Sequence, residues 1–253
     1  MSTDPKTSII DSYKDYYRDV SGPIGGDDRF RWVKETFFGD LKGKRVLEIG
    51  CGEGSLLEML SEGNRVYGVD ISLTGVERAR QKGMEVHHLD ASNQSLPYEN
   101  GFFDVVITLE TIEHVENPHR MLWEIKRILK KDGALLISIP GERVYHPFIY
   151  PGLFTKKNFS EFLRSNGFEI DALRGWGQAP LLSHWSHAAA QSHSPFLSLL
   201  AKGIFYAGRK RNLLMRKHLR TPLYWAFCLN FLCRQDGKSI SRVEEVARHT
   251  TPK

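Results

Sequence analysis

The sequence predicts an α/β fold with a doubly wound, mostly parallel Rossmann-like sheet, helices on both faces and a basic, aromatic C-terminal appendage. Between residues 45 and 173, short apolar runs of strand length alternate with amphipathic stretches of helix length. Glycines and acidic residues follow several of the apolar runs, at the strand ends where open α/β sheets bind ligands. With 253 residues, of which 41% are hydrophobic, the chain is long enough to bury a full core.

Two short helices are predicted before the sheet. Residues 9–20 carry apolar and aromatic side chains at helical spacing, and glycines and a proline at 22–26 interrupt the pattern. A second helix then carries Phe30, Val33 and Phe37. We expect residues 1–40 to form an N-terminal helical lid, followed by a cofactor-binding core at 41–175.

The core is predicted to contain six strands joined by crossover helices. The expected strands are 45–49, 65–69, 85–89, 103–108, 134–139 and 168–173. Asn117 and Pro118 open one helix, which buries Leu129 and ends at Gly133, while Thr155 opens another that ends at Gly167. The alternation of strand and helix predicts parallel pairing.

Residues 176–253 form an appendage of different composition, predicted to cover the substrate. From Ala172 to Gln235 there are nine Lys and Arg residues but no Asp or Glu, which favours an anionic partner. Residues 224–233 read either as the last strand of the sheet or as a buried helix, because periodicity does not separate the two.

Cysteine usage and the N-terminus favour a cytoplasmic protein. Cys51, Cys228 and Cys233 have no paired spacing, so neither a disulfide framework nor a metal site is predicted. Residues 1–14 lack the apolar centre of a secretory signal, and no uncharged apolar run approaches the ~20 residues that span a bilayer.

A glycine-rich turn follows the first predicted strand. Residues 46–54 read Val-Leu-Glu-Ile-Gly-Cys-Gly-Glu-Gly, and the glycines at 50, 52 and 54 allow a sharp turn and close approach of a ligand. Alternatively, these residues form a tight turn that binds no ligand. The spacing differs from the dinucleotide pattern, and no Lys-Ser or Lys-Thr pair follows as in a phosphate loop.

Acidic residues follow the next strands at the same edge of the sheet. Asp70 ends the second strand, 20 residues after Gly50, at the spacing where a carboxylate accepts hydrogen bonds from a ribose diol. Its alternative role is an N-cap for the following helix. Asp90 follows the third strand, and Leu109 and Glu110 follow the fourth.

Residues 44 to about 173 resemble the class I S-adenosylmethionine-dependent methyltransferases, especially the branch of quinone-biosynthesis and other small-molecule enzymes. The resemblance rests on residues 46–54, 69–72, 90–91, 96–97, 103–106, 113–115 and 130–133. It implies S-adenosylmethionine as the cofactor and methyl transfer to a small molecule as the reaction.

The resemblance also implies roles for individual residues. Gly50, Cys51 and Gly52 would lie against the methionine part of the cofactor. Gly54 belongs to the same loop, and Glu48 would lie beneath that loop. Asp70 would bind the ribose hydroxyls. Asp90 would accept a hydrogen bond from the adenine amino group, and Ala91 and Ile71 would lie beside the adenine ring. The backbone of Leu109 would contact the amino-acid end of the cofactor. Tyr13 and Tyr17 would cover the sulfonium, or serve as core aromatics.

Methyl transfer from a sulfonium chiefly requires alignment of the nucleophile and exclusion of water, so a dedicated catalytic residue is not essential. For a hydroxyl acceptor, His114 is the leading candidate base, just past the fourth strand. Glu110 and Glu113 are alternatives, and the histidine could instead cap or pack the following turn.

The acceptor is expected to be small and lipophilic or lipid-linked, with O-, N- and C-methylation left open. After the fourth strand, Leu-Glu-Thr-Ile replaces the Asn/Asp-Pro-Pro-Tyr loop of adenine and glutamine methyltransferases, and no nucleic-acid-binding signature is apparent, so no nucleic-acid partner is expected. Residues 195–220 combine an apolar stripe with basic residues. This segment either contacts an anionic membrane peripherally or packs as a substrate-covering helix.

Two rival functions remain open from the sequence. One is a catalytically silent protein that binds the cofactor as a regulator or scaffold. The other is an NAD-dependent oxidoreductase, which would bind nicotinamide. The oligomeric state is not readable from the sequence.

Overall fold

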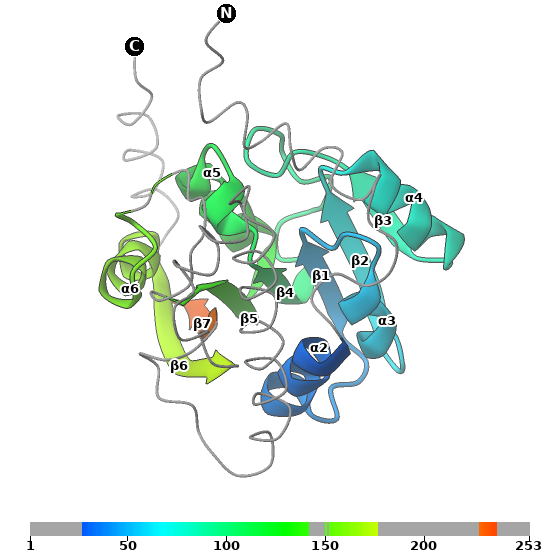
Figure 1. The fold of residues 1–253 in the computed structure, drawn as a ribbon, viewed down its shortest axis with the longest axis horizontal. Helices are drawn as coiled ribbons and strands as arrows, with labels where there is room; N and C mark the ends of the chain where they lie inside the picture. Colours follow the sequence, from blue (N-terminus) through cyan, green and yellow to red (C-terminus); the bar gives the residue numbers. More distant parts are fainter. Residues whose placement is uncertain (1–26, 142–149, 151, 177–227, 237–253) are drawn as a thin grey trace, which may run out of the picture.

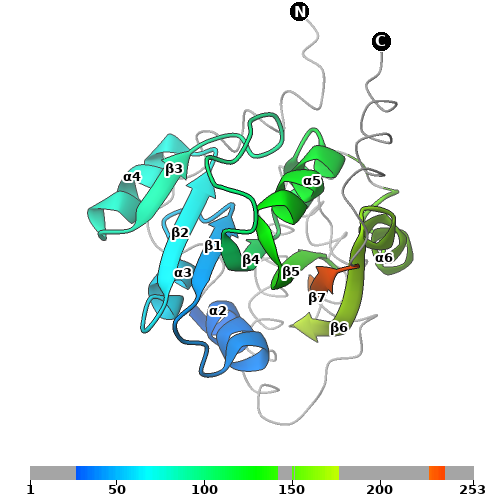
Figure 2. The same ribbon diagram turned by 180° about the vertical axis from the view of Figure 1, so that it is seen from behind.

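A single seven-stranded sheet forms the centre of the protein (Figures 1 and 2). The computed structural model describes residues 27–141, 150, 152–176 and 228–236. The strands are β1 (Arg45–Ile49), β2 (Arg65–Asp70), β3 (Glu85–His88), β4 (Phe103–Leu109), β5 (Leu129–Pro140), β6 (Phe168–Trp176) and β7 (Cys228–Gln235). Their order is β3-β2-β1-β4-β5-β7-β6, with β1 to β5 parallel and β7 antiparallel to both of its neighbours. The predicted fold class is confirmed.

Helices cover both faces of this sheet. The helical segments are α2 (Asp27–Val33), η1 (Lys34–Phe38), α3 (Ser55–Leu60), α4 (Leu73–Gln81), η2 (Ile112–His114), α5 (Pro118–Ile128) and α6 (Lys156–Ser165). Side chains of α2, η1 and α3 pack with Val46, Ile107 and Leu136 of the sheet, and α4 packs beside α3. Side chains of α5 and α6 pack with the alternate strand positions, among them Leu47 and Ile137. The period-two pattern of the strands thus supplies two apolar faces.

Two predicted helix starts have the expected capping bonds. The Asn117 side chain accepts a hydrogen bond from the Arg120 amide at 3.0 Å, and Pro118 is the first helical residue. The Thr155 hydroxyl accepts from the Asn158 amide at 3.2 Å. Both caps satisfy a backbone N–H that has no partner within the helix.

The predicted end of the helix that begins at Pro118 is wrong. The helix stops at Ile128, and the chain is already extended at Leu129, where β5 begins well before Gly133. Leu129 is buried and pairs with Phe103 of β4, and the register then shifts between Phe103 and Val105. A buried leucine suits both a helical stripe and a strand, so periodicity did not reveal the boundary.

The ambiguous stretch near residue 230 contributes a strand. β7 lies between β5 and β6, so that Ser138, Asn230 and Arg174 stand in one row across the three strands. Phe231 of β7 is fully buried and packs edge-on against Phe159 of α6, with ring centroids 5.3 Å apart. Part of the C-terminal appendage therefore belongs to the central sheet.

Some sequence predictions concern other parts of the chain. The first helix with Tyr13 and Tyr17, and the apolar and basic segment 195–220, lie outside the described residues. Within the described ranges, no helix combines the length and apolar character needed to cross a membrane.

We expect Phe231→Ala to lower the free energy of unfolding by about 3–5 kcal/mol, because it removes a fully buried aromatic ring between sheet and helix. Arg234→Gln, at an exposed position of the same strand, should change stability little. Urea unfolding measures both variants. Equal, small effects would show that β7 is not packed into the core as described.

Candidate functional site

The glycine turn after β1 adopts a backbone that favours glycine. Gly50, Gly52 and Gly54 have φ angles of 78°, 52° and 79°. A side chain at Gly50 would collide with Thr111, and one at Gly54 would collide with Met84. The amide of Gly50 also donates to the Val69 carbonyl of β2 at 2.8 Å. The turn is therefore pressed against its neighbours, which explains why glycine is required.

Asp70 at the end of β2 is bonded directly to this turn. Its carboxylate accepts hydrogen bonds from the Gly52 amide and from the Ser72 amide, each at 2.7 Å. Ser72, and not Asp70, is the N-cap of α4, since its side chain accepts from the Gly75 amide. The alternative N-cap reading of Asp70 is thus wrong, because its oxygens are directed to other amides.

The environment of Asp70 is nearly closed to water, with the residue 8% exposed. Burial raises the pKa of its carboxyl, whereas the hydrogen bonds from Ser72 and Gly52 lower it. The glycine turn and the carboxylate predicted to bind a ribose thus lie together at one edge of the sheet.

The β3 end lies beside the β2 end. The Leu89 amide donates to the Asp70 carbonyl at 2.9 Å, which brings Asp90 and buried Ala91 to the same edge. The Asp90 carboxylate accepts from the amide and hydroxyl of Ser92 at 2.9 and 2.6 Å. Asn93 donates to its other oxygen at 3.0 Å. Asp90 therefore already orders its own loop.

Ile71 and Leu109 complete the predicted cofactor set within the described ranges. The Ile71 carbonyl lies 3.0 Å from the His88 ring, and its side chain is partly exposed after β2. Leu109 is buried at the end of β4, and its carbonyl accepts from the Thr111 hydroxyl at 3.1 Å. The described members of the set thus lie at or near the ends of four parallel strands, β1 to β4, whereas Tyr17 lies outside the described residues.

Glu48 is a buried residue of β1, the strand that leads into the glycine turn. It is 3% exposed, and its Oε2 atom has no hydrogen-bond partner in the described part of the chain. Burial raises the pKa of its carboxyl well above the usual range, the charge of Asp70 raises it further, and Arg29 lowers it. An acidic group is therefore buried in β1, two residues before Gly50.

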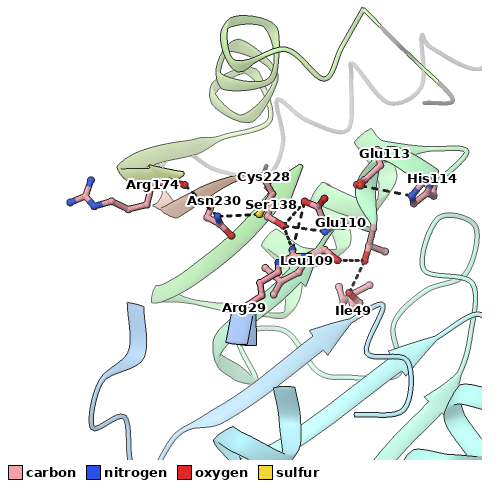
Figure 3. A network of polar contacts seen from close by, with 11 residues as sticks. Arg29, Ile49, Leu109, Glu110, Glu113, His114, Ser138, Arg174, Cys228 and Asn230 are labelled. Atoms are coloured by element: carbon pink, nitrogen blue, oxygen red, sulfur yellow. Dashed lines mark hydrogen bonds and ion pairs between the residues drawn. The ribbon is translucent and has the colours of Figure 1, made fainter. Parts of the chain in front are cut away.

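A buried polar network lies at the end of β4 (Figure 3). Arg29 of α2 donates to the Ser138 hydroxyl at 3.0 Å and lies 3.6 Å from the Glu110 carboxylate. The Ser138 hydroxyl donates to Glu110 Oε1 at 3.0 Å. Burial raises the pKa of the Glu110 carboxyl, whereas Arg29 and Ser138 lower it.

Sequence reasoning missed Arg29 and Ser138. Ser138 carries a detectable signal, because it is the polar residue in an otherwise apolar strand, Ala-Leu-Leu-Ile-Ser-Ile. Arg29 carries none, since a basic residue near the start of an amphipathic helix normally faces solvent. Only the placement of α2 over the sheet brings it to Glu110.

Glu113 and His114, which follow β4, form a second contact that involves an acidic side chain. His114 Nε2 lies 3.8 Å from Glu113 Oε1, with the glutamate side chain fully buried and the histidine side chain 9% exposed. Burial and the charge of Glu110 raise the pKa of the Glu113 carboxyl well above its usual range. The 3.8 Å separation of Nε2 and Oε1 exceeds the length of a hydrogen bond, so this contact between the two side chains is electrostatic.

The described residues contain no group of three or more potential ligand side chains arranged to hold a metal ion. All three cysteines are buried free thiols. The site as described consists of backbone amides, carboxyl groups, the hydroxyls of Ser138 and Thr111, one arginine and one histidine.

The sequence of this chain is similar to those of several known proteins. Residues 47–137 match a family described as a methyltransferase domain. The chain is 33% identical over 200 residues to a ubiquinone biosynthesis O-methyltransferase of Bordetella bronchiseptica, covering 67% of this chain and 80% of that relative. It is 38% identical over 109 residues to the protein of that name from Glaesserella parasuis, covering 39% of this chain and 46% of the relative, so it spans about half of that relative's length.

A solved structure of a protein from Pyrococcus horikoshii OT3 is similar with a TM-score of 0.57 and 18% identity, covering 88% of this chain and 99% of the other. At this identity the likeness concerns the fold.

We expect Glu48→Gln to stabilise the protein more at pH 8 than at pH 5. A carboxyl whose pKa is raised by folding contributes its stability below its unfolded pKa of about 4.3, and that stability is lost as the pH rises through the folded pKa. The glutamine removes this loss, which amounts to about 1.4 kcal/mol per unit of pKa difference.

Urea unfolding at the two pH values tests this expectation, with Glu62→Gln at an exposed position as the control. An equal effect of Glu48→Gln at both pH values would contradict the assignment of a raised pKa to Glu48.

Proposed function

The chain belongs to the class I S-adenosylmethionine-dependent methyltransferase family, and from this premise we propose that it methylates a hydroxyl oxygen of a small, lipophilic phenol. The observation that carries the proposal is the 2.7 Å hydrogen bond from the Gly52 amide to Asp70, because it joins the turn and the acid that would bind the cofactor. The hydroxyl as acceptor is supported by the O-methyltransferase names of the relatives.

The described residues fit S-adenosylmethionine. The turn at Gly50 and Gly52 offers bare backbone for close approach, and Asp70 retains lone pairs that could accept ribose hydroxyls. Glu48, with a buried oxygen that has no hydrogen-bond partner among the described residues, suits the neighbourhood of a cationic ligand. In this proposal Ile71, Asp90 and Ala91 contact the adenine, Leu109 offers its backbone, and Tyr17 covers the sulfonium.

The cofactor supplies a methyl group that is already activated on sulfur. When bound, S-adenosylmethionine would supply this methyl group to the acceptor oxygen and would leave as S-adenosylhomocysteine. His114 takes the hydroxyl proton as general base, with Glu113 beside it at 3.8 Å from Nε2. The protein otherwise aligns the oxygen with the methyl group and excludes water.

The lipophilic character of the acceptor is supported by the sequence and the relatives. Residues 195–220 combine apolar and basic side chains, which suits a lipid-linked acceptor presented at an anionic membrane surface. The relatives are named for ubiquinone biosynthesis.

We expect Asp70→Ala to weaken S-adenosylmethionine binding by about 1.5–3 kcal/mol, the scale of hydrogen bonds to a charged group. Titration calorimetry measures the change. Asp132→Ala, an exposed position near the start of β5, provides the control and should bind as the wild type does. Unchanged affinity in Asp70→Ala would contradict its placement at the ribose.

The function itself is tested with two acceptors, a catechol that carries a short isoprenoid tail and an aniline that carries the same tail. We expect S-adenosylhomocysteine to form with the catechol and not with the aniline. His114→Gln should lower kcat for the catechol by about 10²- to 10⁴-fold with little change in cofactor affinity, because the base is lost while the cofactor contacts remain. Cofactor binding without turnover of any acceptor would instead favour the silent-binder alternative.

A further inference from the structure

The end of β4 has an unusual backbone. Glu110 is the one non-glycine residue with a positive φ in the described part of the chain, at 52°. A side chain in this left-handed region is strained, so surrounding contacts must hold it there. The bend lies directly after Leu109 and directly before Thr111, at the edge where the glycine turn lies.

Ser138 of β5 provides one set of those contacts. Its hydroxyl accepts from the Glu110 amide at 3.1 Å and from Arg29 at 3.0 Å, and donates to the Glu110 carboxylate at 3.0 Å. One donor and two acceptor positions of the hydroxyl are thus all used. The Glu110 amide also approaches the Ser138 carbonyl at 3.3 Å.

Arg29 connects this bend to a distant segment. It lies on α2, 109 positions before Ser138 along the chain, and its side chain is 9% exposed. Besides Glu110, the charges of Glu113 and Glu48 act on its guanidinium. Removal of Arg29 alone would leave these carboxyl groups without their counter-charge, so Arg29 holds the surrounding acidic residues in place at the end of β4.

The residues that follow the bend meet the candidate site. The Thr111 hydroxyl donates to the Leu109 carbonyl and reaches the Ile49 carbonyl at 3.5 Å, and its side chain fills the space that a Cβ at Gly50 would need. The His114 amide then donates to the Thr111 carbonyl at 3.0 Å. A change in the bend would therefore move both Thr111 and His114 relative to the glycine turn.

We propose that Arg29 is a positioning residue for methyl transfer: through Glu110 and Ser138 it holds the β4 bend that sets Thr111 and His114 against the cofactor turn. The proposal rests on the proposed function. It predicts that Arg29 affects the alignment of the acceptor more than the affinity for the cofactor, since Asp70 and Gly52 contact each other without it.

Five variants test the proposal: Arg29→Gln, Arg29→Lys, Glu110→Gln, the double variant of Arg29→Gln with Glu110→Gln, and Arg31→Gln. Arg31 lies on the same helix and is exposed, which makes it the matched control. The turnover of each variant is divided by its S-adenosylmethionine-binding sites, counted by calorimetry, so that unfolded protein does not lower the rate. Hydrogen exchange of residues 109–115 is followed in parallel.

We expect Arg29→Gln to lower kcat by about tenfold to a hundredfold, the scale of a misaligned reacting group, with S-adenosylmethionine affinity unchanged. Arg29→Lys should recover part of the rate. Because both residues act through one contact, the double variant should be no slower than the slower single variant. Exchange at 109–115 should become faster in Arg29→Gln and stay unchanged in Arg31→Gln.

Equal kcat and equal exchange in Arg29→Gln and Arg31→Gln would overturn the proposal, as would a loss of cofactor affinity that accounts for the whole fall in rate. If Arg29→Gln does not fold, Ser138→Ala tests the same link while both charges remain, with the same expected fall and faster exchange. A wild type without turnover would contradict the proposed function. The exchange comparison would then decide by itself whether Arg29 holds the bend.

Discussion

The site depends on one contact, the hydrogen bond between the Gly52 amide and the Asp70 carboxylate. Gly52 belongs to the turn after β1 and Asp70 ends β2, so the bond joins two neighbouring strand ends. It forms because the parallel register aligns Ile49 with Val69, which places the two loops at the same height. The positive φ of Gly52 belongs to the turn that directs its amide at the acid.

A second constraint comes from the inserted strand. β7 lies between β5 and β6 and brings Asn230 beside Ser138, on the sheet face that α2 covers. The polar groups near these strand ends are therefore covered on that face by α2. Burial strengthens each charge interaction, which makes Arg29 the counter-charge to several carboxylates.

Much of the fold followed from local patterns. The apolar runs, the caps at Asn117 and Thr155 and the glycines after β1 each depend on a few neighbouring residues. Boundaries were less certain, as at Leu129, where a buried leucine suits helix and strand equally. The loops of the candidate site were predicted because parallel strands bring their ends to one edge of the sheet, and roles for the individual residues were implied by the family resemblance. Their binding roles stay predictions.

By itself, the sequence determined the alternating architecture, the glycine turn and the acid 20 residues beyond it. Only the tertiary structure decided that Asp70 bonds the turn while Ser72 caps the helix, that residues 228–235 form a strand, and that Arg29 reaches Glu110 and Ser138. The physical reason is the distance along the chain over which each kind of interaction acts. Strand and cap preferences arise within a few residues, whereas a buried ion pair between a helix and a strand end exists only after the sheet has brought them together.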